Sequence, residues 1–243
     1  MSDVVDGYAA TASAYDLYAA ASRPLQVAAI EQLIPLLRPE RGPILDVGAG
    51  SGANVALLLE RLPAARVCAL EPSPAMRSLI LGRLAAHPEW FHRVSVRPED
   101  FFFAPLPDRI GGALLLGVIG HFDPQERAAV IAELARRLPR GGAALLDLQD
   151  PQRPEVVPAY EFAVATIGDL SYRGIAEAWP VGGERMRWRM TYLTLEGERV
   201  LTEATTEHDY HHPGPEVLVA EAAQVGLRAE RVGVGTHWLL IRP

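Results

Sequence analysis

The glycine-rich segment that follows Asp46 holds the residues whose types and spacing point most directly to chemistry. Gly48, Gly50 and Gly52 come after a short apolar run at 43–47 and before a helix-prone stretch. Glycine permits a tight turn and leaves no Cβ between the backbone and a ligand, and the free N–H groups that begin the next helix can donate to that ligand. The segment therefore predicts a strand, a turn and a helix, with a small molecule bound at the turn.

Two classes of ligand fit this turn. Gly48, Gly50 and Ala53 match the G-x-G-x-x-G/A pattern of dinucleotide-binding proteins, and Glu71 ends the next strand about twenty residues later, where such proteins place an acid. Asp46 instead completes the pattern D-x-G-x-G-x-G. A carboxylate there would repel a diphosphate but attract an ammonium group. The acid therefore favours a cationic ligand such as S-adenosylmethionine, which carries an α-ammonium and a sulfonium.

With this motif, the sequence resembles the class I S-adenosylmethionine-dependent methyltransferases. The likeness spans roughly residues 5–243, and further motifs support it at 71–76, 99–101, 117–122 and 138–146. The strings at 15–18 and 119–121 are similar to those of bacterial sugar-amine N-methyltransferases from natural-product pathways, while small-molecule O-methyltransferases of the same build remain open. The resemblance implies direct in-line methyl transfer to nitrogen or oxygen of a small molecule. The alternatives are an NAD(P)-dependent oxidoreductase and a non-catalytic S-adenosylmethionine-binding protein.

The alternation of apolar and helix-prone segments predicts an α/β fold. Strands are expected near 43–47, 66–71, 93–97, 111–117 and 142–148, and helices near 53–61, 73–86 and 124–138. This order is typical of a doubly wound parallel sheet that binds ligands at the carboxyl ends of its strands. A helix at 215–225 and two apolar stretches within 227–242, broken at 233–235, match the terminal hairpin that completes the seven-stranded, mostly parallel sheet of the methyltransferases.

Two segments lie outside this Rossmann-like core of residues 41–150 and 213–243. We expect residues 1–40 to form a helical cap, made of two helical segments that begin at residue 3. In the methyltransferases that this sequence resembles, such a segment often lies over the cofactor. Residues 151–212 predict an antiparallel β insertion after a helix around 157–168. We expect one structural domain overall.

The insertion contains a strict alternation of side chains from 184 to 193. A loop at 195–197 would pair Arg189 with Glu203 and Arg185 with Glu207. The arginine row is then either a paired, solvated strand face or a clamp for an anionic substrate. We expect the opposite face either to cover the active-site crevice or to contact a partner subunit, which would form a homodimer through the hairpin at 180–212.

The resemblance assigns cofactor contacts to the ends of the predicted strands. Glu71 would accept hydrogen bonds from the ribose hydroxyls, although an acid there could also stabilise the start of the following helix. Asp100 would accept from the adenine amino group, with Met76 beneath the ring; of the phenylalanines at 101–103, one would stack on adenine and the others would enter the core. The remaining expected cofactor contacts are Pro72, Phe101, Gly117, Val118, Tyr15 and Arg23, in addition to Asp46, Gly48, Gly50 and Gly52.

His121 and Tyr18 are the expected catalytic residues. His121 follows the fourth strand, and the near-neutral pKa of histidine suits a general base; alternatively, it orients the turn before Asp123. Tyr18 and Tyr15 resemble the tyrosines of the methyltransferase cap. His208, His211 and His212 are close in sequence, but adjacent side chains on a strand point to opposite faces, so no metal is expected.

Composition excludes several classes of function. The formal net charge of −7 disfavours nucleic acid as a partner, and no apolar run is long enough to span a membrane. The single cysteine, Cys68, lies in an apolar strand and is expected to be a buried small side chain. We therefore expect a cytoplasmic protein whose partner is a small-molecule acceptor.

Overall fold

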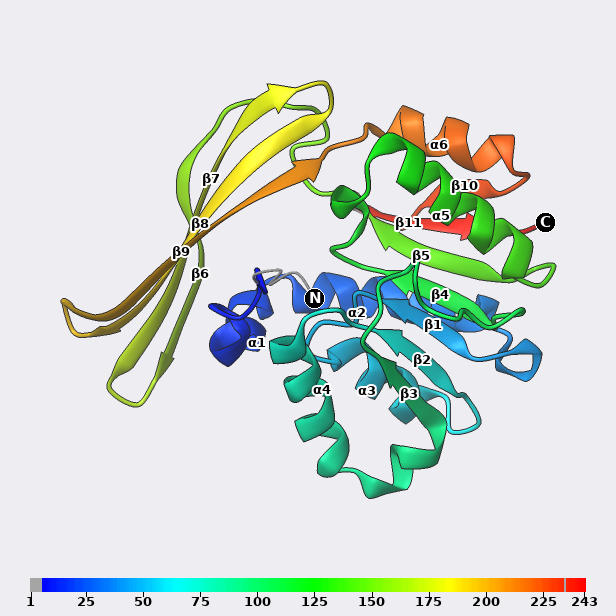
Figure 1. The fold of residues 1–243 in the computed structure, drawn as a ribbon, viewed down its shortest axis with the longest axis horizontal. Helices are drawn as coiled ribbons and strands as arrows, with labels where there is room; N and C mark the ends of the chain where they lie inside the picture. The colour runs from blue at the N-terminus through cyan, green and yellow to red at the C-terminus, as the bar shows by residue number, and fades with distance from the viewer. Residues whose placement is uncertain (1–5, 234) are drawn as a thin grey trace.

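The computed structural model describes residues 6–233 and 235–243, which form two β-sheets (Figure 1). Sheet A has seven strands in the order β10-β11-β5-β4-β1-β2-β3. Strands β1 to β5 pair in parallel, β11 is antiparallel to β5, and β10 is antiparallel to β11. The strands of sheet A are β1 (Ile44–Val47), β2 (Val67–Leu70), β3 (Val94–Arg97), β4 (Gly112–Leu115), β5 (Ala143–Asp147), β10 (Arg228–Arg231) and β11 (His237–Ile241). The predicted doubly wound, mostly parallel sheet is confirmed.

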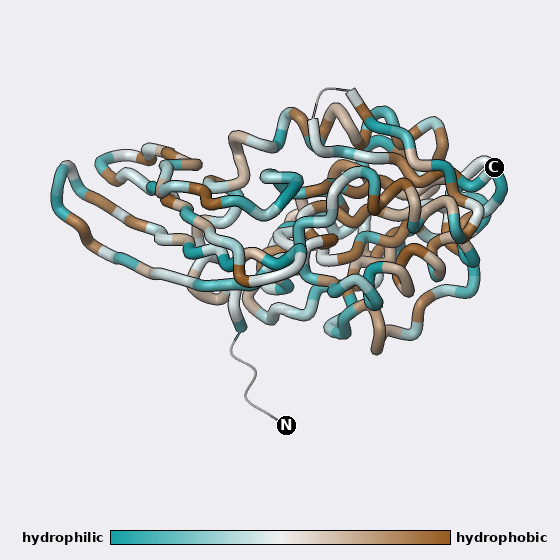
Figure 2. Tube along the Cα trace, turned by 90° about the horizontal axis from the view of Figure 1, so that it is seen from above, coloured by the Kyte–Doolittle hydropathy of each residue, from teal (hydrophilic) through white to brown (hydrophobic). Residues whose placement is uncertain are grey.

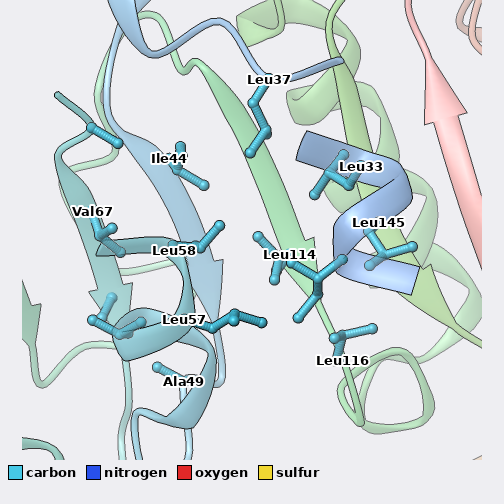
Figure 3. Packing of buried hydrophobic residues seen from close by; sticks show 14 of the residues in the cluster. Leu33, Leu37, Ile44, Ala49, Leu57, Leu58, Val67, Leu114, Leu116 and Leu145 are labelled. Carbon is cyan, nitrogen blue, oxygen red and sulfur yellow. The ribbon is translucent and has the colours of Figure 1, made fainter. Parts of the chain in front are cut away.

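Helices cover both faces of sheet A because its central strands are apolar on both sides. Alternate strand residues such as Ile44, Val67 and Leu114 face a core shared with α2 and α3, and their neighbours face a second core shared with α5 and α6. Figure 3 shows Leu57 and Leu58 of α3 packed against the first set. The helices are α2 (Arg23–Leu33), α3 (Ala53–Arg61), α4 (Pro74–Ala85), α5 (Pro124–Arg137) and α6 (Pro215–Gln224). This packing holds the carboxyl ends of β1, β2 and β4 in a fixed relation.

The N-terminal segment bridges the two sheets. It contains η1 (Ala12–Ala14) and α1 (Tyr15–Ala19), and it leads into α2, η2 (Ile34–Leu36) and η3 (Pro39–Arg41). η1 contacts α4, whereas α1 contacts β6 (Val157–Ile167) and β7 (Leu170–Gly182) of the second sheet, sheet B. The predicted helical segment began at residue 3, and its first residues, 3–5, lie outside the described part of the chain.

Sheet B contains β6 (Val157–Ile167), β7 (Leu170–Gly182), β8 (Arg185–Glu196) and β9 (Arg199–His211), all antiparallel. The helix expected around 157–168 is wrong, because this stretch forms β6. It is rich in aromatic and β-branched residues, which favour strands, and it turns at Gly168, whose φ is +59°, to pair with β7. That strand had no counterpart in the sequence prediction.

The predicted register of the β8–β9 hairpin is also wrong, by four residues. Arg189 lies opposite Glu207 and Arg185 opposite His211. The register differs because the chain turns at Gly197 and Glu198 and because a bulge interrupts the pairing between Thr194 and Leu195. The slip by an even number keeps each side chain on its expected face. The arginine row is paired within the sheet: Arg189 Nε lies 2.9 Å from Glu207 and its Nη1 lies 3.0 Å from Glu177.

The two sheets differ in how hydrophobic residues are distributed along their strands. Figure 2 shows the most hydrophobic stretches gathered in the part of the molecule built on sheet A, while the strands of sheet B alternate along their length. Among the described residues, no helix combines the length and apolar character needed to cross a membrane.

Candidate active site

A cavity of about 600 Å³ lies at the carboxyl ends of the parallel strands of sheet A, where α/β folds bind ligands. The structure brings eleven of the expected site residues together in its lining: Tyr15, Gly48, Gly50, Glu71, Pro72, Met76, Asp100, Phe101, Gly117, Val118 and His121. Asp6, Gly7 and Tyr8 of the N-terminal segment cover it. The cavity therefore extends from the glycine loop of β1 to the segment after β4.

The glycine loop adopts a backbone that other residues rarely reach. Gly48, Gly50 and Gly52 have φ values of +63°, +57° and +79°. A Cβ at Gly48 would lie 2.7 Å from the Val118 side chain, and one at Gly52 would lie 3.1 Å from Ile80. Gly48 and Gly50 line the cavity, whereas Gly52 begins α3 and lies outside the lining.

Asp46 ends up buried beside this loop. Its carboxylate is 1% exposed, and its Oδ2 has no hydrogen-bond partner among the described residues. Burial raises the pKa of Asp46 to about 7; the charge of Glu71 adds to the shift and that of Arg23 opposes it. Asp46 does not itself line the cavity, but it leaves an uncompensated acceptor under the loop, which suits a positively charged ligand and not a diphosphate.

Glu71 lies at the end of β2 and turns its carboxylate toward the glycine loop. Its Oε2 accepts from the Gly50 N–H at 2.7 Å and its Oε1 from the Ser73 N–H at 2.8 Å. Burial raises its pKa, and the two backbone donors oppose that shift. Each oxygen keeps a free lone pair for a ligand hydroxyl.

The segment after β3 shapes another wall of the cavity. Met76 is 1% exposed in the first turn of α4, and Phe101 is buried. Asp100 Oδ1 accepts from the N–H groups of Phe102 at 2.9 Å and Phe103 at 3.2 Å. The expectation that the other two phenylalanines enter the core is wrong, because Phe102 and Phe103 are 46% and 81% exposed.

The opposite wall is an aromatic cluster around His121. The Tyr8 hydroxyl lies 2.9 Å from His121 Nε2 and 3.4 Å from the Tyr210 hydroxyl, and the rings of His121 and Tyr210 are 4.7 Å apart. His208 stacks on Tyr8 with centroids 6.0 Å apart. His121 is accessible from the cavity, yet desolvation by this cluster, with a smaller effect of His208, lowers its pKa to about 4. The imidazole is therefore neutral at neutral pH.

Tyr8, Tyr210 and His208 are the members of this cluster that the sequence prediction missed. Tyr210 lies on β9 opposite Met186, whereas the predicted hairpin ended with Arg185 opposite Glu207 and gave Tyr210 no partner. Tyr8 belongs to the aromatic positions of the N-terminal segment, whose spacing alone does not distinguish packing from a cavity wall.

Two carboxylates hold the N-terminal segment over the cavity. Asp6 Oδ2 accepts from the Ser73 hydroxyl at 2.8 Å. Asp16 accepts from the Ser51 hydroxyl and from Arg83 Nη2, the latter at 2.6 Å. Tyr15 lies between these two attachment points in the sequence, and burial raises its pKa to about 12. The segment therefore shields this side of the cavity from water.

The structure does not bring Tyr18 and Arg23 into the cavity lining. Tyr18 packs between α1 and sheet B, with its ring 4.9 Å from that of Tyr192. Arg23 donates to the Ala53 carbonyl at 3.0 Å and to the Asn54 side chain, and so it binds the first turn of α3.

Gly117 is held by a residue that the sequence prediction did not name. Its N–H donates to Asp147 Oδ1 at 2.7 Å, which fixes the segment after β4 to the end of β5. Gly117 lines the cavity, its φ of +71° favours glycine, and a Cβ there would meet open space. Burial raises the pKa of Asp147.

The three neighbouring histidines of β9 and the segment after it have separate partners. His212 Nε2 accepts from the Trp188 ring N–H at 2.9 Å, and its Nδ1 lies 2.7 Å from the Pro151 carbonyl oxygen. His211 lies beside Glu184 and His208 beside Tyr8. Across the described residues, histidine, cysteine and acidic side chains form no group of three suited to a metal ion.

These features together fit a nucleoside that bears a positively charged amino acid. The buried Asp46 oxygen matches a cation, Glu71 can accept hydrogen bonds from a ribose, and the glycine loop leaves its backbone open to the cavity. The fold and the cavity are those of the S-adenosylmethionine-dependent methyltransferase class.

Comparisons with known proteins agree with this class. A family model described as a methyltransferase domain matches residues 44–142. A trans-aconitate 2-methyltransferase of Methylobacterium nodulans is 30% identical over 187 residues, which cover 70% of this chain and 68% of that protein. One from an Acidovorax species is 32% identical over 123 residues, which cover 50% of this chain but only 44% of that protein's length. The chain belongs to the class I S-adenosylmethionine-dependent methyltransferase family.

Solved structures share this fold over most of the chain. An S-adenosylmethionine-bound amino pentose methyltransferase from Micromonospora echinaspora has a TM-score of 0.71 at 20% identity, with 91% of each chain covered. A sugar N-methyltransferase from Streptoalloteichus has a TM-score of 0.65 at 23% identity and covers 84% of this chain and 81% of its own. The likeness to structures of sugar-modifying methyltransferases that the short sequence motifs suggested is confirmed at the level of the fold.

Proposed function

We propose that this methyltransferase acts on a small molecule that is neutral or cationic, and that the methyl group passes directly to an amine nitrogen in preference to a hydroxyl oxygen. The observation that carries the proposal is the charge of the cavity. Among its described lining residues, Asp6, Glu71 and Asp100 are acidic and none is an arginine or lysine.

This charge argues against an anionic acceptor. The relatives described above are named for trans-aconitate, which is a tricarboxylate. Recognition of a tricarboxylate requires guanidinium or ammonium donors. Arg23 and Arg83, which lie near the glycine loop, are already bound to Asn54 and Asp16. A positively charged or neutral acceptor meets no such penalty, because the nearby carboxylates attract an ammonium group.

The aromatic cluster gives the acceptor end neutral hydrogen-bonding groups. Burial raises the pKa of Tyr8 well above its usual value, with Tyr210 adding to the shift, so the phenol keeps its proton while the His121 imidazole is neutral. A neutral imidazole can accept a hydrogen bond from an attacking amine and so orient its lone pair, and Tyr8 can orient the imidazole through the 2.9 Å contact. A hydroxyl acceptor would depend more heavily on this base.

The cofactor end of the cavity has a residue for each part of the nucleoside and the amino acid. We assign the ribose hydroxyls to Glu71, the adenine to Met76, Asp100 and Phe101, and the ammonium to the backbone of the segment at 117–118, in the field of Asp46. When bound there, the cofactor supplies an activated methyl group on sulfur, so the protein needs no covalent intermediate. Its residues must hold the acceptor in line with that methyl and exclude water, and such positioning contributes up to roughly 7–11 kcal/mol to a barrier reduction.

The roles of Tyr18 and Arg23 are reassigned in this proposal. Tyr18 supports the N-terminal segment against Tyr192 of sheet B, and Arg23 supports the start of α3. Tyr8 takes the place beside His121 that the sequence had suggested for Tyr18. Because the cavity reaches this cluster beyond the glycine loop, we favour catalysis over simple binding of the cofactor.

Matched acceptors test the proposed chemistry. Methyl glycosides with an amino group at one carbon, the same glycosides with a hydroxyl there, and trans-aconitate are each incubated with enzyme and S-adenosylmethionine, and adenosylhomocysteine release is measured by mass spectrometry. We expect turnover of amines at least about tenfold faster than of hydroxyls, a ratio that corresponds to about 1.4 kcal/mol, and none of trans-aconitate. Turnover of trans-aconitate above that of every amine would refute the proposed acceptor class.

A homodimer through the hairpin at 180–212 stays a prediction. Val200 and Leu201 near the tip of that hairpin are 48% and 40% exposed, and an interface is one way to cover them. Sedimentation of the protein tests it: a dimer that a Leu201→Glu substitution converts to a monomer supports the hairpin interface, and a wild-type monomer at all concentrations contradicts it.

A further inference from the structure

We propose that Arg127 is a positioning residue that acts through Glu184: it locks one end of sheet B against the helices of sheet A, and thereby holds Tyr210 and His208 around His121. The proposal rests on the proposed function only in treating this end of the cavity as the acceptor end. It assigns a role to a residue that touches neither the cavity nor the cofactor.

Arg127 is the most deeply buried charged side chain of α5. The residue is 1% exposed, and its guanidinium is bound by two carboxylates from different elements. Its Nε and Nη2 lie 2.9 Å from the two oxygens of Glu221 on α6, and its Nη1 lies 2.6 Å from Glu184 in the β7–β8 turn. Figure 1 shows this end of sheet B beside α5 and α6, while the other end projects away from sheet A.

Stability alone does not account for this arrangement. Removing charges from water offsets most of the attraction in a buried ion pair, so apolar residues of similar volume often stabilise a fold as well or better. The planar guanidinium, however, binds both carboxylates in one fixed geometry. A bridge of this kind specifies where the β7–β8 turn sits relative to α5 and α6.

The position of Glu184 is transmitted to the aromatic cluster through β9. Its carbonyl oxygen accepts from the His212 N–H at 2.7 Å, and its carboxylate lies 3.4 Å from the His211 ring. The next residue toward the cavity is Tyr210, which packs so closely on Gly120 that a Cβ there would lie 2.9 Å from the Tyr210 ring. Movement of this turn therefore moves Tyr210 away from His121.

The cofactor end has no part in this path. Gly48 and Gly50 belong to the loop after β1, and Glu71 directly follows β2. The Glu71 carboxylate binds the N–H groups of Gly50 and Ser73, and none of these residues contacts Glu184 or Arg127 through a hydrogen bond among the described residues. Loss of the Arg127 bridge to sheet B should therefore change the surroundings of His121 and leave nucleoside binding intact.

Substitution of each of the two carboxylates that bind the Arg127 guanidinium separates a positioning role from a contribution to stability. Glu184→Ala and Glu221→Ala each remove one carboxylate from Arg127 and leave the other in place, but only Glu184 belongs to sheet B. The His121 ring is observed by NMR of the full-length protein labelled at histidine Cε1, with its signal among the seven histidines assigned by its loss in His121→Gln. Adenosylhomocysteine affinity is measured by calorimetry in the same samples.

We expect Glu184→Ala to raise the titration midpoint of His121 from about 4 toward the ordinary histidine value by at least about one pH unit, because desolvation by the cluster is relieved. Glu221→Ala should leave the midpoint unchanged, and both variants should bind adenosylhomocysteine with affinity within about twofold of the wild type, less than half a kcal/mol. The proposal is overturned if the two variants shift His121 equally, if neither does, or if Glu184→Ala weakens cofactor binding as well. No acceptor is needed, so these outcomes are independent of whether the proposed reaction is correct.

Discussion

Replacement of Asp46 by asparagine should uncouple cofactor affinity from pH. The pKa of Asp46 is raised from 3.8 to about 7, chiefly by burial, which is a shift of about 3 units. At about 1.36 kcal/mol per unit, the buried carboxylate costs the folded protein on the order of 4 kcal/mol above pH 7. An ammonium group placed in its field recovers part of that cost.

The sign of the effect follows from proton linkage. Between pH 4 and 7 the folded protein keeps the Asp46 proton that the unfolded chain has released, so this residue's contribution to stability falls as the pH rises through that window. Binding of a cation favours the ionised carboxylate. Affinity should therefore increase as the pH rises toward 7 and level off above it.

Calorimetric titration with adenosylhomocysteine at pH 5.5, 6.5 and 8 measures this coupling. Wild-type protein should bind up to about tenfold more tightly at pH 6.5 than at pH 5.5, and only about fourfold more tightly again at pH 8, with proton release visible as a dependence of the heat on the buffer. Asp46→Asn should bind weakly and with little pH dependence, and it should unfold at a higher denaturant concentration than the wild type at pH 8. Equal affinity and equal pH dependence of the two proteins would refute the assignment of Asp46.

Three further substitutions test other parts of the structure. Glu71→Gln should weaken adenosylhomocysteine binding by about 1.5–3 kcal/mol, because a charged acceptor of ribose hydrogen bonds is lost; calorimetry measures it, and unchanged affinity would argue against the ribose role. His121→Ala should lower kcat more for a hydroxyl than for an amine acceptor, and equal activity of the variant and the wild type on the true substrate would remove His121 from the mechanism. Leu58→Ala, at a fully buried position of α3, should lower the free energy of unfolding by about 2–5 kcal/mol, as measured by urea denaturation. A loss below about 1 kcal/mol would contradict close packing of the core beneath the glycine loop.

The sheet A half of the fold was predictable because its signals are local. Each parallel strand is a short apolar run, as at 67–70, and each following helix begins with a turn or cap signal such as Asp123, which accepts from the N–H groups of Gln125 and Glu126. Ligand-binding residues of such a sheet gather at the carboxyl ends of its strands. Eleven of the residues predicted for the site therefore line one cavity, although the prediction used no tertiary contacts.

Sheet B and the acceptor end depended on contacts that the sequence does not encode locally. Acidic residues recur at 203, 207 and 209, so Arg189 finds a carboxylate opposite it whether the pair is Glu203 or Glu207. Charge pairing therefore did not distinguish the register with Glu203 from the register with Glu207. The two-residue turn that begins at Gly197 and the bulge beside it select the second. Tyr8 and Tyr210, which are 202 positions apart, meet only because the two sheets are held together.

Binding of the wild-type protein to the two nucleotide classes tests the central claim most directly. Adenosylhomocysteine and NAD are titrated separately into the protein at pH 8, and binding is followed by calorimetry and by the melting temperature. The structure predicts saturable binding of adenosylhomocysteine, a rise in melting temperature, and no measurable heat with NAD. Saturable binding of NAD at the glycine loop, with no response to adenosylhomocysteine, would contradict the account.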